Sequence, residues 1–231
     1  MNTQNANKRI RLIMDLRTKG ITDTDVLSAI ERIPRDEFVS HQMRDQAWED
    51  MALPIGLGQT ISQPFVVAKM TEILRISDRD KVLEIGTGCG YQCAVLSKLA
   101  RRVYSIERHK HLLIDAQERF EHLRLRNITT IAADGMKGWP TINGIDQAPF
   151  DKIIVTAAAR KKPPEALLDQ VKVGGMLIIP VGEPGDQVLK CYKKESEEAY
   201  AVRSVMPVRF VPLLPDVSDE RNDMSEIAVN S

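Results

Sequence analysis

The sequence predicts an α/β protein with a doubly wound, mainly parallel sheet, and three observations support this fold class. First, short apolar runs rich in β-branched residues recur along the chain: "KVLEIG", "RVYSIE", "ITTIAAD", "FDKIIVTAA" and "GMLIIPVG". Second, helical patterns at about 91–100, 109–125 and 163–172 separate runs of this kind, as in a parallel sheet covered on both faces. Third, "QVLKCYKK" and "AYAVRSVMPVRFVPL" follow Gly182 without an intervening helix, which predicts an antiparallel C-terminal hairpin.

The first third of the chain has a different pattern. Residues 8–50 are expected to be mostly helical, with Thr22 and Asp23 as candidate caps and a break at Pro34. After a loop that contains two glycines, apolar residues at helical spacing predict a further helix from about Gln63 to Leu74. We therefore divide the chain into a helical N-terminal cap with its loop at 1–75, a core at 76–215 and a flexible polar tail at 216–231. We expect these parts to form one compact domain.

The bulk composition limits the partners of this protein. Lys plus Arg and Asp plus Glu both number 32 among 231 residues, so we expect neither nucleic acid nor a membrane as a partner. Three cysteines, an odd and small number, suit a reducing compartment. The N-terminal stretch lacks the apolar centre of a signal peptide, and no apolar run is long enough to cross a bilayer. We therefore expect a cytoplasmic protein, and we expect it to be a monomer. We expect no metal site, because no third ligand accompanies His109 and His111 at a diagnostic spacing.

Three predicted strands bring candidate ligand-binding residues to one edge of the sheet. Ligands of open parallel sheets bind there, at the carboxyl ends of the strands. The first strand leads into a loop whose glycines allow a sharp turn and the close approach of a ligand: Gly86, Gly88 and Gly90. The second strand ends at Glu107, whose carboxylate can accept hydrogen bonds from both hydroxyls of an adenosine ribose. The third strand ends in Asp134 and Gly135, so the three strand ends together indicate a nucleoside cofactor.

The glycine spacing favours S-adenosylmethionine over a nicotinamide dinucleotide. The pattern is G-T-G-C-G-Y rather than G-x-G-x-x-G, so the third glycine comes one residue early. Glu84 stands two residues before the first glycine. A carboxylate near this loop is a poor neighbour for a pyrophosphate and a good neighbour for an ammonium or a sulfonium. This charge argument favours the sulfonium cofactor.

The loop "GLGQTISQP" raises a question about Ser62. Taken alone, Ser62 is a polar residue near a helix start, or Gln63 is the cap with Pro64 at the first helical position. The same hydroxyl could instead serve chemistry, since a helix N-terminus also favours an anion. This stretch of sequence by itself leaves both interpretations open.

Five segments together resemble the protein-L-isoaspartate O-methyltransferase family: "LPIGLGQTISQPFVVAKMTEIL", "VLEIGTGCGYQCAVLSKLARRVYSIER", "DGMKGWP", "FDKIIVTAAA" and "PVRFVPL". The resemblance extends from about Ile33 to Leu213. It implies a Rossmann-like fold of the class I S-adenosylmethionine-dependent methyltransferases. It also implies an enzyme that methylates the free carboxylate of L-isoaspartyl residues in damaged proteins and peptides. The ester formed in this family collapses to a succinimide, which reopens in part to normal aspartate.

The resemblance assigns roles to individual residues of this chain. It implies a cofactor site lined by the Ser62 loop, the glycine loop and the next two strand ends: Thr60, Gln63, Glu84, Gly86, Thr87, Gly88, Glu107, Arg108, Asp134 and Gly135. It implies substrate contacts from two separate segments: Ile61 and Ser62, and Val208, Arg209 and Phe210. In this interpretation Ser62 is the catalytic hydroxyl.

The implied chemistry is consistent with a hydroxyl in that role. Attack of a carboxylate on a sulfonium methyl group is a displacement by a nucleophile that is already ionised at pH 7, so no general base is needed. The remaining task is positioning, which a neutral hydroxyl performs without the tight charge pairing of a Lys or Arg. We therefore expect Ser62 to contact the substrate carboxylate.

Three alternatives stay open on the sequence alone. An enzyme of the same fold could esterify a different carboxylate, such as an aspartate in one dedicated peptide. A non-catalytic cofactor-binding or interaction module would keep the fold without turnover. A nicotinamide oxidoreductase is the third alternative, although the second half of the chain shows no hydride-transfer site.

Overall fold

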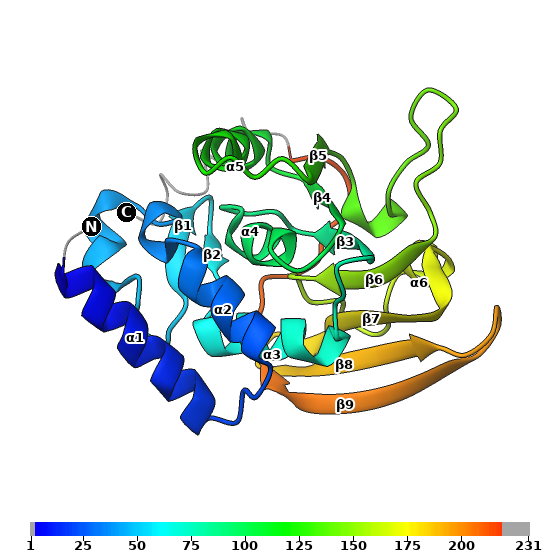
Figure 1. Ribbon diagram of the computed structural model, residues 1–231. Coiled ribbons are helices and arrows are strands. Elements are labelled where there is room, and N and C mark those ends of the chain that lie inside the picture. The colour runs from blue at the N-terminus through cyan, green and yellow to red at the C-terminus, as the bar shows by residue number, and fades with distance from the viewer. Residues whose placement is uncertain (1–2, 219–231) are drawn as a thin grey trace.

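The computed structural model describes residues 3–218, which fold around a seven-stranded sheet (Figure 1). Its strands are β3 (Lys81–Ile85), β4 (Arg102–Glu107), β5 (Ile128–Ala132), β6 (Phe150–Val155), β7 (Val171–Glu183), β8 (Asp186–Lys194) and β9 (Tyr200–Val208). Their order across the sheet is β5-β4-β3-β6-β7-β8-β9. The chain moves outward from β3 to β5 and then returns to the other side of β3, so the topological switch point lies between β3 and β6.

The strand pairing matches the predicted topology. β3 pairs in parallel with β4 and β6, β4 pairs in parallel with β5, and β6 does so with β7. The pairs β7–β8 and β8–β9 are antiparallel. The doubly wound, mainly parallel sheet with an antiparallel C-terminal hairpin is therefore confirmed.

The helices surround this sheet. They are α1 (Thr3–Thr18), α2 (Thr24–Arg32), α3 (Pro64–Leu74), α4 (Tyr91–Ser97), α5 (Lys110–His122) and α6 (Glu165–Asp169), with 3-10 turns η1 (Arg35–Glu37), η2 (His41–Gln46) and η3 (Gly135–Lys137). One of the two predicted caps is confirmed, because the Asp23 carboxylate accepts hydrogen bonds from the N–H groups of Asp25 and Val26.

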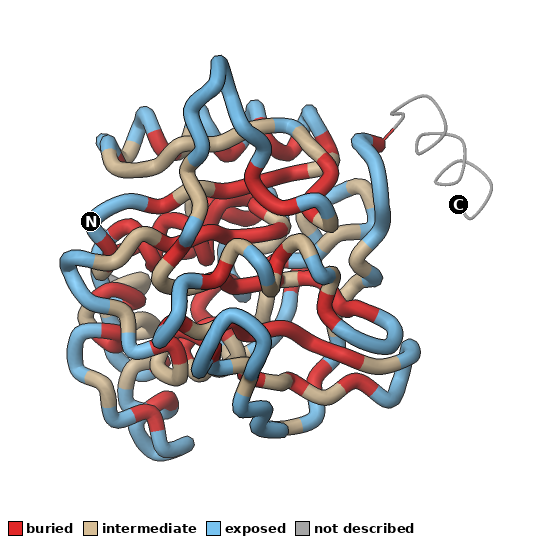
Figure 2. The backbone as a smooth tube through the Cα atoms, turned by 90° about the vertical axis from the view of Figure 1, so that its right-hand side faces the viewer, coloured by how far each residue is buried: buried red, intermediate tan, exposed pale blue. Residues whose placement is uncertain are grey.

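Alternate residues of the central strands supply two separate cores. Val82 and Ile154 point to the face on which α1 to α5 place their apolar residues. Their neighbours Leu83 and Ile153 belong to the second core, which also contains Leu167 of α6. This alternation follows from the period of two in a strand, and it explains why the central strands carry apolar residues on both faces. Figure 2 shows the buried residues concentrated in the interior of the molecule.

A hairpin occupies the part of the N-terminal region that the sequence indicated only as a loop. β1 (Leu53–Gly56) pairs in antiparallel fashion with β2 (Gln59–Ile61), and Leu53 and Ile61 are both buried. The turn places Leu57 and Gly58 at positive φ, the geometry that suits a tight hairpin. Leucine is uncommon in that conformation, so the residues of this turn did not predict a hairpin.

Two sequence predictions need correction. The helix predicted at 163–172 is wrong at its end, because α6 stops at Asp169 and Val171 already pairs with Phe150 as the start of β7. The tail predicted to be flexible from residue 216 begins attached to the core. The N–H of buried Ser218 donates to the Arg108 carbonyl at 3.0 Å. The remainder of that tail lies outside the described residues.

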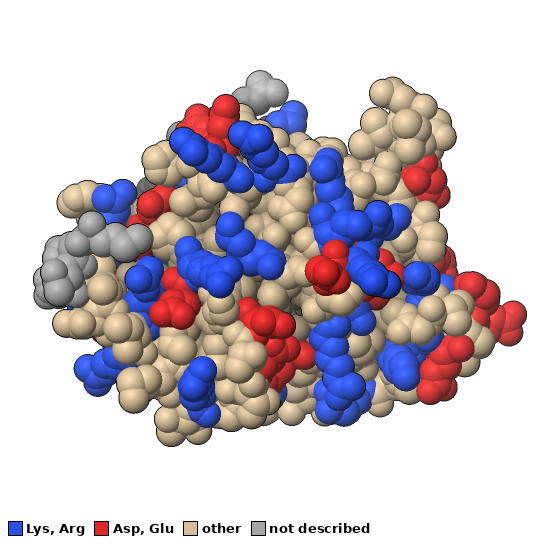
Figure 3. Space-filling model, in the orientation of Figure 1, with Lys and Arg blue, Asp and Glu red and all other residues tan. Residues whose placement is uncertain are grey.

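Two further properties of the described residues bear on possible partners: the length and apolar character of the helices, and the charge on the face drawn in Figure 3. Among residues 3–218, no helix combines the length and the apolar character that crossing a bilayer requires. Figure 3 shows basic and acidic side chains interspersed over the face drawn there.

Candidate active site

A cavity of about 810 Å³ opens at the carboxyl ends of the parallel strands. Its walls come from segments far apart in the sequence: the β2–α3 loop, the loop after β3, the end of β4 and the chain after β9. The volume falls within the range of about 300–1,000 Å³ that is usual for small-molecule sites. The cavity also lies beside the switch point, where ligands of open parallel sheets bind.

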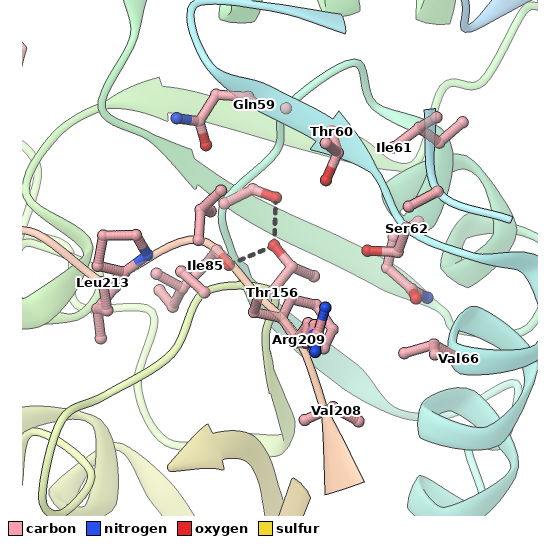
Figure 4. A pocket seen from close by; sticks show the side chains of 18 of the residues that line it. Gln59, Thr60, Ile61, Ser62, Val66, Ile85, Thr156, Val208, Arg209 and Leu213 are labelled. Atoms are coloured by element: carbon pink, nitrogen blue, oxygen red, sulfur yellow. Dashed lines mark hydrogen bonds between the residues drawn. The ribbon is translucent and has the colours of Figure 1, made fainter. Parts of the chain in front are cut away.

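The glycine loop turns into the cavity at Gly86, which has φ +95°. The carbonyls of Ile85 and Gly86 accept hydrogen bonds from Thr156 Oγ1 at 3.0 and 2.8 Å (Figure 4). A Cβ atom at Gly86 would collide with this same hydroxyl. Glycine is therefore required both for the backbone conformation and for the close approach. Sequence analysis missed Thr156, because nothing in "IIVTAA" indicates that its hydroxyl faces the glycine loop.

Glu107 fastens the glycine loop to the end of β4. Its Oε2 atom accepts a hydrogen bond from the Gly88 N–H at 2.8 Å. Its Oε1 atom accepts from the N–H groups of Arg108 and His109 at 2.8 and 2.9 Å. The side chain lines the cavity, and an ionised carboxylate has about four acceptor positions, so acceptor capacity remains for a ligand hydroxyl.

Glu84 lies beneath the glycine loop rather than in the cavity wall. The side chain is fully buried, and its Oε2 atom accepts a hydrogen bond from Ser105 Oγ at 2.5 Å. Ser105 Oγ is in turn 2.6 Å from Thr87 Oγ1. Burial raises the pKa of Glu84 to about 8, against the opposing effect of the Ser105 hydrogen bond. The raised pKa favours the neutral form of Glu84 at pH 7, so the charge argument drawn from the sequence loses its basis.

This protonation predicts a pH-dependent effect of Glu84→Gln on stability. Between the ordinary pKa of 4.5 and about 8, the folded protein holds a proton that the unfolded chain has lost. The free energy of unfolding of the wild type therefore falls as pH rises, by up to about 1.4 kcal/mol per pH unit from this group. Glutamine does not titrate, so the variant lacks this loss of stability. Urea unfolding from pH 5 to 8 is therefore expected to show the free energy of unfolding of the variant rising relative to that of the wild type as pH rises. The exposed Glu121→Gln is the control, and a constant difference across this range would contradict the prediction.

Asp134 and Gly135 lie where β5 ends, but only Gly135 lines the cavity. Asp134 Oδ1 accepts a hydrogen bond from the Met136 N–H at 2.9 Å, and Oδ2 lies 3.2 Å from Lys137 Nζ. Desolvation acts in the opposite direction, but these contacts and a backbone N–H from Asp216 lower the pKa of Asp134. A Cβ atom at Gly135 would collide with Ile85, so this position can be no larger.

The Ser62 hydroxyl points into the cavity, with Thr60 on the same wall (Figure 4). Within residues 3–218, no hydrogen bond engages the Ser62 hydroxyl. Val208 and Arg209 lie across the cavity from it (Figure 4). A half-buried hydroxyl without a protein partner at the wall of a cavity is available to a ligand.

The predicted cap position is confirmed, because Gln63 occupies the cap position of α3 and Pro64 the first helical position. Neither the Gln63 side chain nor the Ser62 side chain caps the helix. Asp50 does so from outside the helix, because its Oδ1 atom accepts a hydrogen bond from the Phe65 N–H at 2.7 Å. Its Oδ2 atom accepts from Gln63 Nε2 at 3.1 Å. Sequence analysis missed Asp50, which lies 15 residues before the group it caps.

The segment after β9 is held against the cavity by Gln187, which sequence analysis also missed. Gln187 Oε1 accepts a hydrogen bond from the Phe210 N–H at 2.6 Å, and Nε2 donates to the Phe210 carbonyl at 3.0 Å. The N–H of Ala158 donates to the Val211 carbonyl, and the N–H of Leu213 donates to the Ala158 carbonyl, both at 2.8 Å. These contacts hold "PVRFVPL" along one wall.

The cavity brings together most of the residues that the family resemblance implies. Those that line it are Thr60, Ile61, Ser62, Gln63, Gly86, Thr87, Gly88, Glu107, Arg108, Gly135, Val208, Arg209 and Phe210. Glu84 and Asp134 lie outside the lining. Glu84 is connected to the lining residue Thr87 through Ser105, and Asp134 directly precedes the lining residue Gly135. The division of these residues between cofactor and substrate stays a prediction.

The fold and the rim of glycines and acids define a Rossmann-like S-adenosylmethionine-dependent methyltransferase of class I. Residues 7–218 match the family described as Protein-L-isoaspartate(D-aspartate) O-methyltransferase. The chain belongs to this family, as the five sequence segments indicated.

Individual relatives and solved structures agree with this assignment over most of this chain. A protein-L-isoaspartate O-methyltransferase of Rhodospirillum centenum is 53% identical over 215 residues, which cover 93% of this chain and 95% of the relative. One of Paramagnetospirillum magneticum is 55% identical over 213 residues, covering 91% of this chain and 96% of the relative. A solved protein-L-isoaspartate O-methyltransferase structure has a TM-score of 0.80 at 28% identity, covering 94% of this chain and 69% of its own. A Plasmodium falciparum structure in complex with S-adenosyl-L-homocysteine has a TM-score of 0.76 at 25% identity, covering 88% of this chain and 97% of its own.

Proposed function

We propose that this protein transfers the methyl group of S-adenosylmethionine to the free carboxylate of L-isoaspartyl residues in damaged proteins and peptides. The ester so formed starts repair through a succinimide. One observation carries this proposal: the Ser62 hydroxyl, which has no hydrogen-bond partner within residues 3–218, and the glycine loop line the same cavity. They do so in a chain that matches the isoaspartyl methyltransferase family over residues 7–218.

The residues present fit the cofactor. Gly86 and Gly88 leave backbone close to the cavity, and Glu107 offers remaining acceptor capacity to a ribose. Thr60, Gln63, Arg108 and Gly135 line the same cavity. When bound there, S-adenosylmethionine supplies an electrophilic methyl group.

The chain's own task is to aim the substrate carboxylate. Ser62 donates a hydrogen bond to one carboxylate oxygen, which leaves the other oxygen free to attack. Val208, Arg209 and Phe210 border the space in which the substrate backbone would lie, with Ile61 beside Ser62. No residue has to remove a proton, because the attacking carboxylate is ionised at pH 7.

A direct assay tests this function. Labelled S-adenosylmethionine is supplied with three peptides that differ only in containing an isoaspartyl, an aspartyl or a glutamyl residue. We expect methyl transfer to the isoaspartyl peptide and background levels with the other two. Transfer to an aspartyl peptide instead would favour the alternative of a dedicated aspartate substrate. No transfer, with S-adenosylhomocysteine still bound, would contradict the proposed activity.

We also propose that the protein acts as a cytoplasmic monomer on isoaspartyl-containing proteins and binds neither nucleic acid nor membranes. The balanced charge, 32 basic and 32 acidic residues, supports this picture. Light scattering after size exclusion tests the monomer, which predicts a mass near 26.0 kDa.

A further inference from the structure

Arg35 is a buried cation directly behind the Ser62 loop. Its side chain is 0% exposed, although removing a guanidinium from water is costly unless other groups compensate. It stands at the start of η1 after Pro34, between the buried residues Ile33 and Phe38. The methyl transfer described above assigns no role to this residue.

The compensation comes from three backbone carbonyls. Arg35 Nε donates to the Ala47 carbonyl at 2.8 Å. Its Nη2 atom donates to the Ser62 carbonyl at 2.8 Å and to the Met51 carbonyl at 3.3 Å. One rigid guanidinium therefore joins the Ser62 loop to the segment that precedes β1, and it fixes the peptide unit that follows the Ser62 side chain.

The same guanidinium connects the Ser62 loop to the cofactor side of the cavity. Its Cζ atom lies 4.7 Å from the ring centroid of Tyr91, the first residue of α4 after the glycine loop. Phe38 packs edge-on against this ring, with 5.5 Å between centroids. The guanidinium of Arg35 thus lies over the ring of Tyr91, directly after the glycine loop, and one of its nitrogens donates to the Ser62 loop.

The positive charge of Arg35 is not neutralised by an ion pair within the described part of the chain. Asp50 is the carboxylate that acts on it through space, and Asp50 is itself engaged with Lys19 at 2.5 Å and with the N-terminus of α3. Arg35 Nη1 has no hydrogen-bond partner within residues 3–218. A net positive charge therefore remains behind Ser62, and water screens it little because the site is buried.

We infer that Arg35 is a positioning residue for methyl transfer: it holds the Ser62 peptide so that the hydroxyl faces the substrate carboxylate, and its buried charge favours an anion there. The inference rests on the proposed function. It explains how a neutral serine can recruit a carboxylate, because a cation that favours the anion lies behind the serine. The cation acts from one layer further back, so it attracts the carboxylate without a direct ion pair that would hold back the attacking oxygen.

Arg119 provides a matched control within the same protein. It too donates to two backbone carbonyls, from Nη1 to Cys89 at 3.3 Å and from Nε to Glu37 at 3.1 Å. Cys89 belongs to the glycine loop, so Arg119 supports the cofactor side and does not contact Ser62. Arg119→Lys is expected to weaken S-adenosylhomocysteine binding and to leave the KM for the isoaspartyl peptide unchanged.

The test compares Arg35→Lys with the wild type in two backgrounds, with Ser62 present and with Ser62→Ala. With Ser62 present, kcat/KM for the isoaspartyl peptide is expected to fall by about tenfold or more, the effect of one good hydrogen bond to a charged group. Calorimetric affinity for S-adenosylhomocysteine is expected to stay within about threefold. With Ser62→Ala, the further loss from Arg35→Lys is expected to shrink to about threefold or less, because coupled residues are not additive. Arg35→Gln, which removes the buried charge, replaces Arg35→Lys if the lysine variant does not fold.

Three results would overturn the inference: an unchanged kcat/KM in a folded Arg35 variant, an equal loss in both backgrounds, or an equal loss of peptide turnover and cofactor affinity. Hydrogen exchange gives a readout that does not depend on activity. Arg35→Lys is expected to speed exchange in residues 59–66 and to leave residues 85–90 as in the wild type. If the wild type transfers no methyl group, the proposed function fails, and the exchange comparison still decides whether Arg35 holds the loop.

Discussion

Replacing Ser62 by alanine is expected to lower kcat/KM for an isoaspartyl peptide by on the order of 10²-fold, with unchanged affinity for S-adenosylhomocysteine. The hydroxyl faces the cavity without a partner among the described residues, so its removal disturbs no hydrogen bond of the free protein. A hydrogen bond to a carboxylate is worth about 1.5–3 kcal/mol, which corresponds to about 10- to 150-fold in rate. Methyl transfer from labelled S-adenosylmethionine, together with calorimetry, measures both quantities.

Ser204→Ala is the matched control for this substitution. Ser204 is an exposed serine on β9 that does not line the cavity, so its loss is expected to change neither quantity. Thr60→Val tests the second hydroxyl on the same wall. Full activity of Ser62→Ala would remove the catalytic role from Ser62 and leave the structure without a function for its hydroxyl, since Asp50 caps α3.

Glu107→Gln is expected to weaken S-adenosylhomocysteine binding by about 10- to 10²-fold, the largest effect on cofactor affinity that the site predicts. The carboxylate accepts three backbone hydrogen bonds and has capacity left for a ribose hydroxyl. An amide keeps one acceptor oxygen and places two hydrogens where acceptors are needed. The loop at Gly88 and the ligand would therefore both lose a partner.

Calorimetric titration with S-adenosylhomocysteine checks this prediction. Glu198→Gln, in the exposed turn between β8 and β9, is the charge-matched control. The KM for the isoaspartyl peptide at saturating cofactor is expected to change little, because Glu107 lies on the glycine-loop side of the cavity. Unchanged cofactor affinity would contradict the assignment of Glu107 to the ribose.

The fold was largely predictable because each central strand is a short run rich in apolar and β-branched residues. Buried parallel strands need apolar residues on both faces, and this local pattern survives without tertiary information. The β1–β2 hairpin was missed because its turn places Leu57 at positive φ. The helix before β7 was predicted to extend too far, because Val171 suits a buried strand as well as a helix.

The site was predictable where its residues lie in contiguous motifs, such as the glycine loop and the Ser62 loop. It was not predictable where a side chain acts across the fold. Thr156 binds a loop 70 residues away, and Arg35 binds the Ser62 carbonyl 27 residues away. The ionisation of Glu84 was misjudged for a related reason, because it depends on burial under a loop that the sequence does not place.

The most direct measurement is a crystal structure of the protein with S-adenosylhomocysteine and an isoaspartyl peptide. We expect the substrate carboxylate to lie within hydrogen-bond distance of Ser62 Oγ, about 2.5–3.0 Å, with its second oxygen facing the sulfur. We also expect the ribose hydroxyls to contact Glu107. A carboxylate bound away from Ser62, or a cofactor bound outside the glycine loop, would contradict the proposed roles of Ser62 and Glu107.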